Sequence, residues 1–295
     1  MPSSPLLIRS MDCGASGVFA EISAERANWE YLNMAARRLD IGGRYAGETG
    51  DFELAHVILG GRCNIRTSSG DYLNIGRRPN VFSGMPWALY LPPNTQYEIE
   101  ALTNGFEVAS CWVKADAEFP AKLVTPADCA IELRGGENAS RQINSILPPG
   151  FPCQKLVVVE VYTPGGNWSS YPPHKHDVHR VDAGGHLLEA DLEEIYFYKL
   201  DKPNGYAYQR VYTGDGKLDE LVRAQNHDMV LVPEGYHPVV SAFGYTTYYL
   251  NFLAGSAQSL ANADDPAYAW IKDEWKALDS RLPIVSMAME QTPHP

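Results

Sequence analysis

Three histidines and one acid in the second half of the chain have the residue types of a metal site. His174 and His176 are separated by one residue, and two side chains at positions i and i+2 of a strand point to the same face, within reach of one ion. Glu194 opens a strongly β-forming run, and His237 follows a proline–glycine turn. Imidazole nitrogen suits the later first-row divalent metals. The sequence therefore predicts one divalent transition metal, such as zinc, manganese or iron, held by His174, His176, Glu194 and His237.

The segments that must position these residues are predicted to be strands. Of the 295 residues, 45% are apolar and only 20% are charged, and the chain contains 25 glycines and 21 prolines. This composition favours many short strands joined by turns over a helical bundle. Helical patterns are confined to the ends, at residues 23–32 with Ser23 as the N-cap and at residues 265–275 with Asp265 as the N-cap. We expect an all-β chain with short terminal helices.

The strands are expected to form two similar halves. Each half contains a strand that ends at a proline and continues into a turn, at residues 87–95 in the first and at residues 228–237 in the second. The stretch 134–150 separates them, and the predicted domains are residues 1–140 and residues 141–295. Because His56 is the only histidine of the first domain, we expect that barrel to be structural and to hold no metal.

Charge and cysteine content limit the partners and the compartment. The net charge of −12 argues against nucleic acid or an anionic membrane as a partner, but not against a small anionic substrate. No apolar run approaches the ~20 residues that span a bilayer, and the first residues lack the pattern of a secretory signal. The five cysteines are dispersed, as in reduced cytosolic proteins. We expect a cytoplasmic protein and leave open whether it forms a homo-oligomer.

The order of these residues resembles two motifs of the cupin superfamily, a glycine-rich turn leading to H-x-H and then Glu, and a P-x-G turn followed by His. The resemblance implies two cupin-type, jelly-roll-like β-barrels, a bicupin. The spacer between His176 and Glu194 is longer than the usual three or four residues, which implies an inserted loop at 177–191 and leaves Glu189 or Glu193 open as the ligand. Glu194 is preferred because it shares one strand face with Tyr196 and Tyr198. The matching residues are Gly165, Gly166, His174, His176, Glu194, Pro233, Gly235 and His237.

Longer matches indicate one family within the cupins. Residues 168–177, 188–198 and 232–238 resemble the 5-deoxy-glucuronate isomerase family of myo-inositol catabolism. The resemblance implies an enzyme, an intramolecular oxidoreductase that converts 5-deoxy-glucuronate, an aldose, to the ketose 5-dehydro-2-deoxy-gluconate. A metal bound by three imidazoles and one carboxylate is a Lewis acid for the carbonyl and the adjacent hydroxyl of such a small sugar acid.

The sequence does not identify the base that moves the proton between the two carbons. Glu160, Glu193 and Tyr196 are the candidate residues, with Glu189 and a metal-bound hydroxide as alternatives.

The carboxylate of a sugar acid also needs cationic partners, and arginine offers a bidentate pair. Arg180 and Arg210 are candidates because they lie in or near the motif segments, and Tyr171 is a candidate hydroxyl donor. Lys175 alternates away from the histidines on its predicted strand, which argues against it.

Three other functions stay open. A sister isomerase would act on 5-keto-4-deoxyuronate, and a cupin dioxygenase would use the same four ligands for oxygen chemistry. A non-catalytic sugar-binding cupin would be expected to have lost part of its ligand set, whereas all four residues are present.

Overall fold

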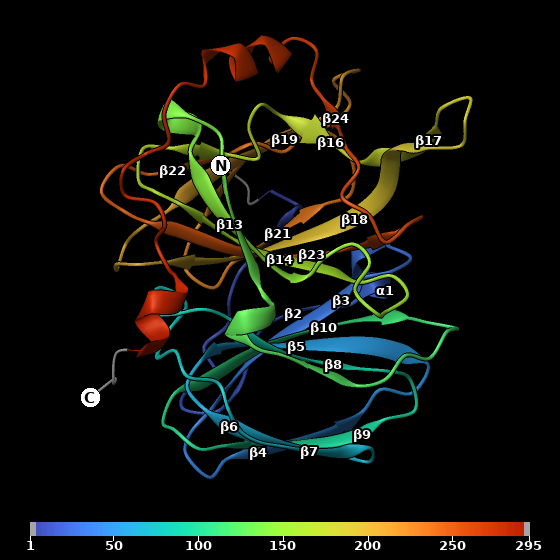
Figure 1. The fold of residues 1–295 in the computed structure, drawn as a ribbon, viewed down its shortest axis with the longest axis vertical. Helices are drawn as coiled ribbons and strands as arrows, with labels where there is room; N and C mark the ends of the chain where they lie inside the picture. Colours follow the sequence, from blue (N-terminus) through green and yellow to red (C-terminus); the bar gives the residue numbers. More distant parts are fainter. Residues whose placement is uncertain (1–3, 292–295) are drawn as a thin grey trace. The chain divides into compact units, whose positions relative to one another are not determined.

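The computed structural model describes residues 4–291, and its regular secondary structure consists mainly of antiparallel strands (Figure 1). The all-β expectation is therefore confirmed. No helix among these residues has the length and apolar composition needed to cross a membrane. The helices of this part of the chain are α1 (Ala24–Ala27) and the 3₁₀ turns η1 (Pro126–Asp128), η2 (Glu137–Ala139), η3 (Ala269–Glu274) and η4 (Met287–Gln291).

The two terminal helices are shorter than expected. Helix α1 begins after Ser23, whose hydroxyl accepts the amide proton of Arg26 at 3.1 Å, so the predicted N-cap is confirmed. The second prediction was wrong in detail, because η3 begins at Ala269 rather than directly after Asp265. The carboxylate of Asp265 instead accepts the amide proton of Ala267 at 2.9 Å in the preceding turn.

The chain divides into two compact units, and neither unit is one continuous segment. Of the described residues, the N-unit comprises 10–130, 150–156 and 285–291, and the C-unit comprises 4–9, 131–149 and 157–284. The expected division at 140/141 therefore differs from the packing. Residues 131–140 and residues 4–9 belong to the C-unit, whereas residues 150–156 belong to the N-unit.

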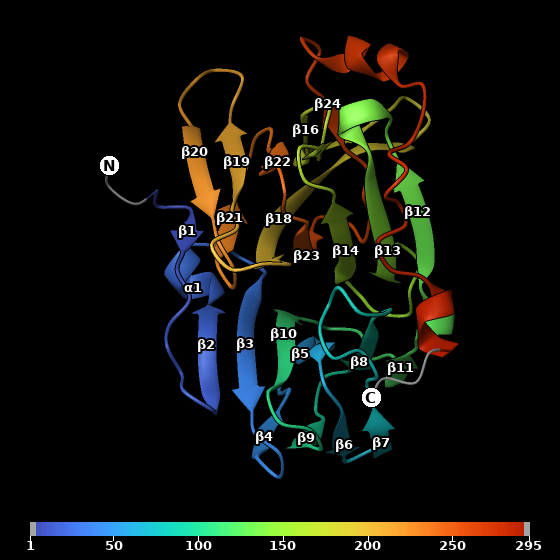
Figure 2. The same cartoon turned by 90° about the vertical axis from the view of Figure 1, so that its left-hand side faces the viewer.

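The N-unit consists of two antiparallel sheets with orders β11-β8-β5-β10-β3-β2 and β4-β9-β6-β7 (Figure 2). Alternate residues of β9 are buried, namely Tyr97, Ile99 and Ala101, as expected of a strand with one face toward a core. The core draws on both sheets and so lies between them. The strands are β2 (Gly17–Ile22), β3 (Asn33–Leu39), β4 (Arg44–Glu48), β5 (Phe52–Gly60), β6 (Cys63–Thr67), β7 (Gly70–Ile75), β8 (Trp87–Leu91), β9 (Gln96–Ala101), β10 (Phe106–Lys114) and β11 (Lys122–Val124).

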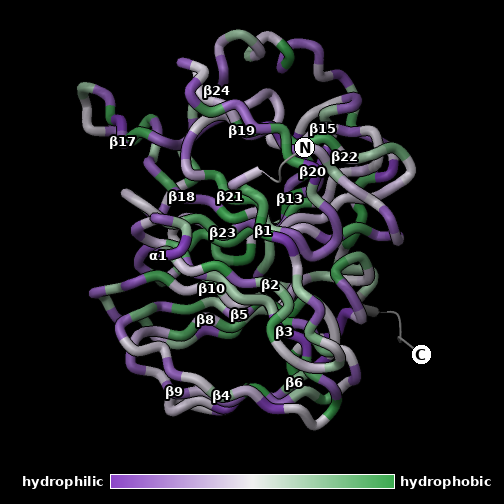
Figure 3. The backbone as a smooth tube through the Cα atoms, turned by 180° about the vertical axis from the view of Figure 1, so that it is seen from behind, coloured by the Kyte–Doolittle hydropathy of each residue, from purple (hydrophilic) through white to green (hydrophobic). Residues whose placement is uncertain are grey.

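The C-unit has the same construction, with a large sheet of order β1-β21-β18-β23-β14-β13-β12 facing a smaller one of order β15-β22-β19-β20. Strands β21 and β23 are coloured largely hydrophobic in Figure 3, in keeping with their burial. A short ribbon pairs β16 with β24. The strands are β1 (Leu7–Ile8), β12 (Ala130–Arg134), β13 (Arg141–Leu147), β14 (Val157–Thr163), β15 (Trp168–Ser169), β16 (His174–Lys175), β17 (Asp177–Val181), β18 (Leu187–Leu200), β19 (Ala207–Tyr212), β20 (Asp219–Ala224), β21 (Met229–Val232), β22 (Val239–Ser241), β23 (Thr247–Gly255) and β24 (Ala263–Asp264).

The insertion expected at 177–191 is a β-hairpin rather than a loop. Strand β17 pairs with the first part of β18, with Asp177 opposite Asp191 and Val181 opposite Leu187. The rest of β18 continues into the large sheet between β21 and β23 (Figure 1).

Candidate metal centre

The hairpin brings His176 next to Glu194, although 17 residues separate them in the chain. Because Asp177 lies opposite Asp191, the preceding His176 lies opposite Leu192, and the amide of Leu192 donates to the His176 carbonyl at 2.8 Å. The His176 ring donates through Nδ1 to the carbonyl of Leu192 at 3.1 Å. This bond fixes the ring and turns Nε2 toward Glu194, two residues further along β18.

The proline–glycine turn positions His237 in a similar way. The Nδ1–H of His237 donates to the carbonyl of Gly235 at 2.8 Å, and the amide of Gly235 donates to the carboxylate of Asp177 at 2.9 Å. Gly235 has φ +85°, and a Cβ at this position would lie 2.4 Å from the carbonyl oxygen of Tyr212. Only glycine fits here, which explains the residue type in the motif.

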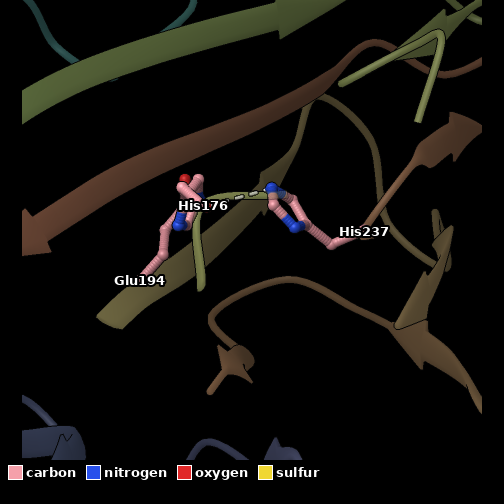
Figure 4. A group of neighbouring side chains, drawn as sticks. All are labelled: His176, Glu194 and His237. Carbon is pink, nitrogen blue, oxygen red and sulfur yellow. Dashed lines mark hydrogen bonds and ion pairs between the residues drawn. The ribbon is translucent and has the colours of Figure 1, made fainter. Parts of the chain in front are cut away.

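The three side chains converge on one point (Figure 4). The Nε2 atoms of His176 and His237 lie 3.0 and 3.3 Å from the same carboxylate oxygen of Glu194. Their possible ligand atoms all lie within 4.8 Å of one another, and all three residues are buried. Among residues 4–291, these three residues are the group of histidine, cysteine, aspartate or glutamate side chains whose ligand atoms lie close enough together to hold one metal ion.

His174 lies beside this group. Its ring centroid is 4.8 Å from that of His237 and 6.4 Å from that of His176. The structure therefore brings three of the four predicted ligands into a single cluster and places the fourth in contact with one of them.

Burial and neighbouring charge set the protonation of these rings. Burial lowers the pKa of His237 to about 3 and, together with the charge of His176, lowers that of His174 to about 3. Burial also opposes the imidazolium of His176, but the hydrogen bond and charge of Glu194 outweigh it and raise the pKa of His176. Two rings are thus neutral at pH 7, as a metal ligand must be.

The donor set fits a divalent metal ion. Nε2 of His237 is buried and makes no hydrogen bond, and a buried polar atom without a partner is costly. Since both Nδ1–H groups are used by backbone carbonyls, Nε2 of His237 presents a lone pair toward the carboxylate, and Nε2 of His176 can do so when it gives up the proton of its 3.0 Å hydrogen bond to Glu194. Two or three imidazoles with one carboxylate form a set that zinc, manganese or iron can accept.

His174, His176 and Glu194 line a cavity of about 190 Å³ inside the C-unit. The lining residues come from alternate positions of the surrounding strands, for example Val159 and Val161 of β14. The polar and charged members are Glu132, Arg134, Arg141, Ser145, Ser170, His174, His176, Glu194, Tyr196, Tyr249, Asn251 and Asn262.

Residues 6–271 match the KduI/IolB family. The chain belongs to this family. Relatives named 5-deoxy-glucuronate isomerase include a protein of Geobacillus thermodenitrificans, 40% identical over 92% of this chain and 97% of its own length. A protein of the same name from Bacillus subtilis strain 168 is 37% identical over 85% of this chain and 91% of its own length.

Solved structures agree with the KduI/IolB assignment and with the fold. The crystal structure of an IolB-like protein from Salmonella typhimurium aligns with a TM-score of 0.85 at 34% identity, covering 91% of this chain and 99% of the other. An oxalate decarboxylase from Lactobacillus farciminis aligns over all of this chain and 98% of its own, with a TM-score of 0.62 at 13% identity. The expected fold class, two cupin-type barrels, is confirmed.

The acids predicted as alternatives lie outside the cavity lining. Glu160 alternates with Val159 and Val161 on β14 and so occupies the opposite face, where it accepts hydrogen bonds from Asn144 and Tyr248. Glu189 is buried against Lys175 at 2.8 Å. Glu193 neighbours Glu194 on β18, and its side chain therefore leaves the opposite face of the strand.

Tyr196 does line the cavity. Its hydroxyl lies 3.0 Å from the Ser170 hydroxyl, and its ring centroid is 5.9 Å from that of His237. Burial raises the pKa of Tyr196 well above its usual range. The group is therefore a neutral phenol that can donate a hydrogen bond, and it is poorly suited to act as a base.

The residues predicted to bind substrate are not members of the lining. Arg210 forms a bidentate pair with Asp219 at 2.7 and 2.8 Å. Arg180 is half exposed on the hairpin, 3.5 Å from Glu189, and Tyr171 packs against Trp168. These residues were candidates because they are close to the motifs along the chain. Closeness along the chain does not show whether a side chain faces the cavity.

Arg141 and Asn251 line the cavity and were missed from the sequence. The sequence predicts a connection between barrels at residues 134–150, whereas in the structure Arg141, Ile143 and Ser145 alternate along β13 toward the cavity. An arginine at the start of a largely buried strand was the available signal.

Proposed function

We propose that this KduI/IolB protein is a metal-dependent aldose–ketose isomerase that converts 5-deoxy-glucuronate to 5-dehydro-2-deoxy-gluconate in inositol catabolism. The choice of substrate rests on the 40% identity, over 92% of the chain, to a protein named 5-deoxy-glucuronate isomerase. The enzyme would act on this small sugar acid in the cytoplasm, in keeping with its five free cysteines.

The proposed metal ligands are His176, Glu194 and His237, with His174 as the fourth. The supporting observations are the shared carboxylate oxygen, the orphaned Nε2 of His237 and the two Nδ1–H bonds that fix the rings. When bound, a divalent metal would supply Lewis-acid stabilisation of negative charge on the substrate oxygens.

The chain itself would orient the substrate through hydrogen-bond donors. Isomerisation removes a proton from C2 of the aldose and returns one to C1, and the charge that develops on oxygen needs hydrogen-bond donors. The neutral phenol of Tyr196, supported by Ser170, is the proposed donor. Glu132 is the carboxylate of the lining that the proposed metal site does not use.

The test is to incubate the metal-replete protein with 5-deoxy-glucuronate in deuterated water, without oxygen, and to follow the aldehyde proton by NMR. The proposal predicts loss of the aldose signal, with equal gain of the ketose and no consumption of a second reactant. No turnover of this compound but turnover of 5-keto-4-deoxyuronate would identify the sister isomerase instead. Turnover only with oxygen would identify a dioxygenase, and binding without turnover a non-catalytic cupin.

A further inference from the structure

Arg141 is a buried cation in the metal cavity. Its side chain lines the cavity, and the residue is only 5% exposed. Burial lowers the pKa of Arg141 to about 10, so the guanidinium remains charged at pH 7. Its charge also contributes to the lowered pKa of His174, which places it near the proposed metal ligands.

No acidic side chain within residues 4–291 forms an ion pair with Arg141. In this part of the chain its hydrogen bond is one from Nη1 to the carbonyl of Ala139, at 3.0 Å. The guanidinium also lies over the ring of Trp275, 5.6 Å from the centroid. An arginine carries five N–H donors in a planar fork, so most of them are left for a ligand.

The backbone around Arg141 makes room for this head group. Gly135 has φ +97°, and a Cβ there would lie 2.8 Å from Nη1 of Arg141 and 2.0 Å from the carbonyl oxygen of Ala139. A larger residue at 135 would displace both the guanidinium and its one acceptor.

Arg134 lines the same cavity and provides a contrast. Its Nε and Nη2 atoms both donate to the carboxylate of Glu132 at 2.8 Å, so its fork is already occupied. Since a buried charge without a counterion is costly, a ligand would explain the burial of Arg141 but is not needed to explain that of Arg134.

Asn251 provides a second, independent unpartnered group. It is 3% exposed, it lines the cavity from β23, and its buried Nδ2 makes no hydrogen bond. The cavity therefore offers a free bidentate cation and a free neutral donor. A ligand with one carboxylate and neighbouring hydroxyls, which is a sugar acid, complements both.

We propose that Arg141 binds the carboxylate of the sugar-acid substrate and that Asn251 donates to one of its hydroxyl oxygens. This assignment rests on the proposed function and names the groups that select an acid over a neutral sugar.

The test compares 5-deoxy-glucuronate with 5-deoxy-glucose, in which a CH₂OH group replaces the carboxylate. Arg141→Met is expected to lower kcat/KM for the acid on the order of 10- to 100-fold, mainly through KM, with little change for the neutral sugar. Arg141→Lys should restore part of the preference for the acid, since it keeps the charge but loses the fork. Asn251→Ala should lower kcat/KM for both sugars alike, because both keep the hydroxyls.

The matched control is Arg134→Met, which removes the same charge from the same cavity and should leave the preference for the acid nearly unchanged. Metal content and the melting temperature are measured for every variant. Arg141→Met should keep its metal and melt no lower than the parent, because it relieves a buried unpaired charge. An equal fall for both sugars in Arg141→Met, or an unchanged preference, would overturn the assignment.

Calorimetric binding of 5-dehydro-2-deoxy-gluconate to the metal-free protein separates this inference from the proposed function. Binding that disappears in Arg141→Met but not in Arg134→Met supports the role of Arg141 in binding the carboxylate, even if the parent protein fails to isomerise 5-deoxy-glucuronate. Unaltered binding in Arg141→Met contradicts that role, whether or not the parent protein turns over 5-deoxy-glucuronate.

Discussion

At the scale of single residues, the proposed metal site depends on how two buried imidazoles are held. His176 and His237 each donate a hydrogen bond from Nδ1–H to a backbone carbonyl, and the Nε2 atoms of both rings face one oxygen of Glu194. Hydrogen bonds of this kind fix the tautomer and orientation of metal-binding histidines. A substitution of His176, His237 or Glu194 should therefore lower metal affinity more than it lowers the stability of the fold.

The two adjacent glutamates give a matched test of the ligand assignment. Glu194→Gln is expected to lower metal affinity by at least about 10- to 100-fold, because it removes the one anionic ligand. Glu193→Gln removes the same charge from the opposite face of β18 and should keep the metal. Elemental analysis after dialysis measures both. Loss of metal in Glu193→Gln with retention in Glu194→Gln would contradict the assignment.

Protons are expected to compete with the metal at His176. Glu194 raises the pKa of His176 in the metal-free protein, and a protonated ring has no lone pair to offer. The apparent metal affinity should thus fall as the pH falls, by about tenfold per unit once His176 is mostly protonated. His174 and His237, each with a pKa of about 3, should add little between pH 8 and pH 5.5. A competitive metal titration over this range would show a flat curve if His176 is not a ligand.

At the scale of elements, turns and hairpin register bring distant residues together. The turn at Gly235 sets His237, and the β17–β18 hairpin sets His176 against Glu194. Both elements are joined where the amide of Gly235 donates to Asp177.

Alanine substitutions at two glycines separate backbone strain from steric fit. Gly235 and Gly244 have similar φ values of +85° and +88°, but a Cβ would meet the Tyr212 carbonyl oxygen at 2.4 Å in the first and nothing within 4 Å in the second. Both changes should cost about 1 kcal/mol of stability from the positive φ. Only Gly235→Ala should in addition displace the turn and weaken metal binding. Thermal unfolding and metal analysis measure the two effects, and equal metal retention in both would contradict the role of the turn.

The same elements explain what could be predicted from the sequence. The H-x-H pair and the P-x-G-x-H turn are local patterns, so His176, Glu194 and His237 could be predicted from the sequence. The hairpin was expected as a loop because its polar, exposed residues carry little periodicity. Arg141 was missed since the strand neighbours of β13, which decide its inward direction, lie far away in the sequence.

At the scale of the whole molecule, the chain crosses between its two units more than once. Residues 150–156 return to the N-unit, where the buried carboxylate of Glu53 accepts the amide protons of Gln154, Lys155 and Leu156 at 2.7, 2.7 and 2.9 Å. This acid holds a segment that the linear division had assigned to the other domain.

Glu53→Gln should therefore destabilise the protein by about 3 kcal/mol, because the amide NH₂ would face backbone N–H donors in a buried place. The half-exposed Glu98, paired with Arg44 at 3.3 Å, is the control, and Glu98→Gln should cost less than about 1 kcal/mol. Urea unfolding of both variants measures the difference. Similar stability of the two would show that Glu53 does not hold the segment.

Anomalous diffraction from crystals of the metal-replete protein, at the absorption edge of the bound metal, would locate the ion. We expect one strong peak in the C-unit, within bonding distance of Nε2 of His176, Nε2 of His237 and the carboxylate of Glu194. A metal-replete crystal with no peak there, or with its peak at other residues, would contradict the proposed metal site.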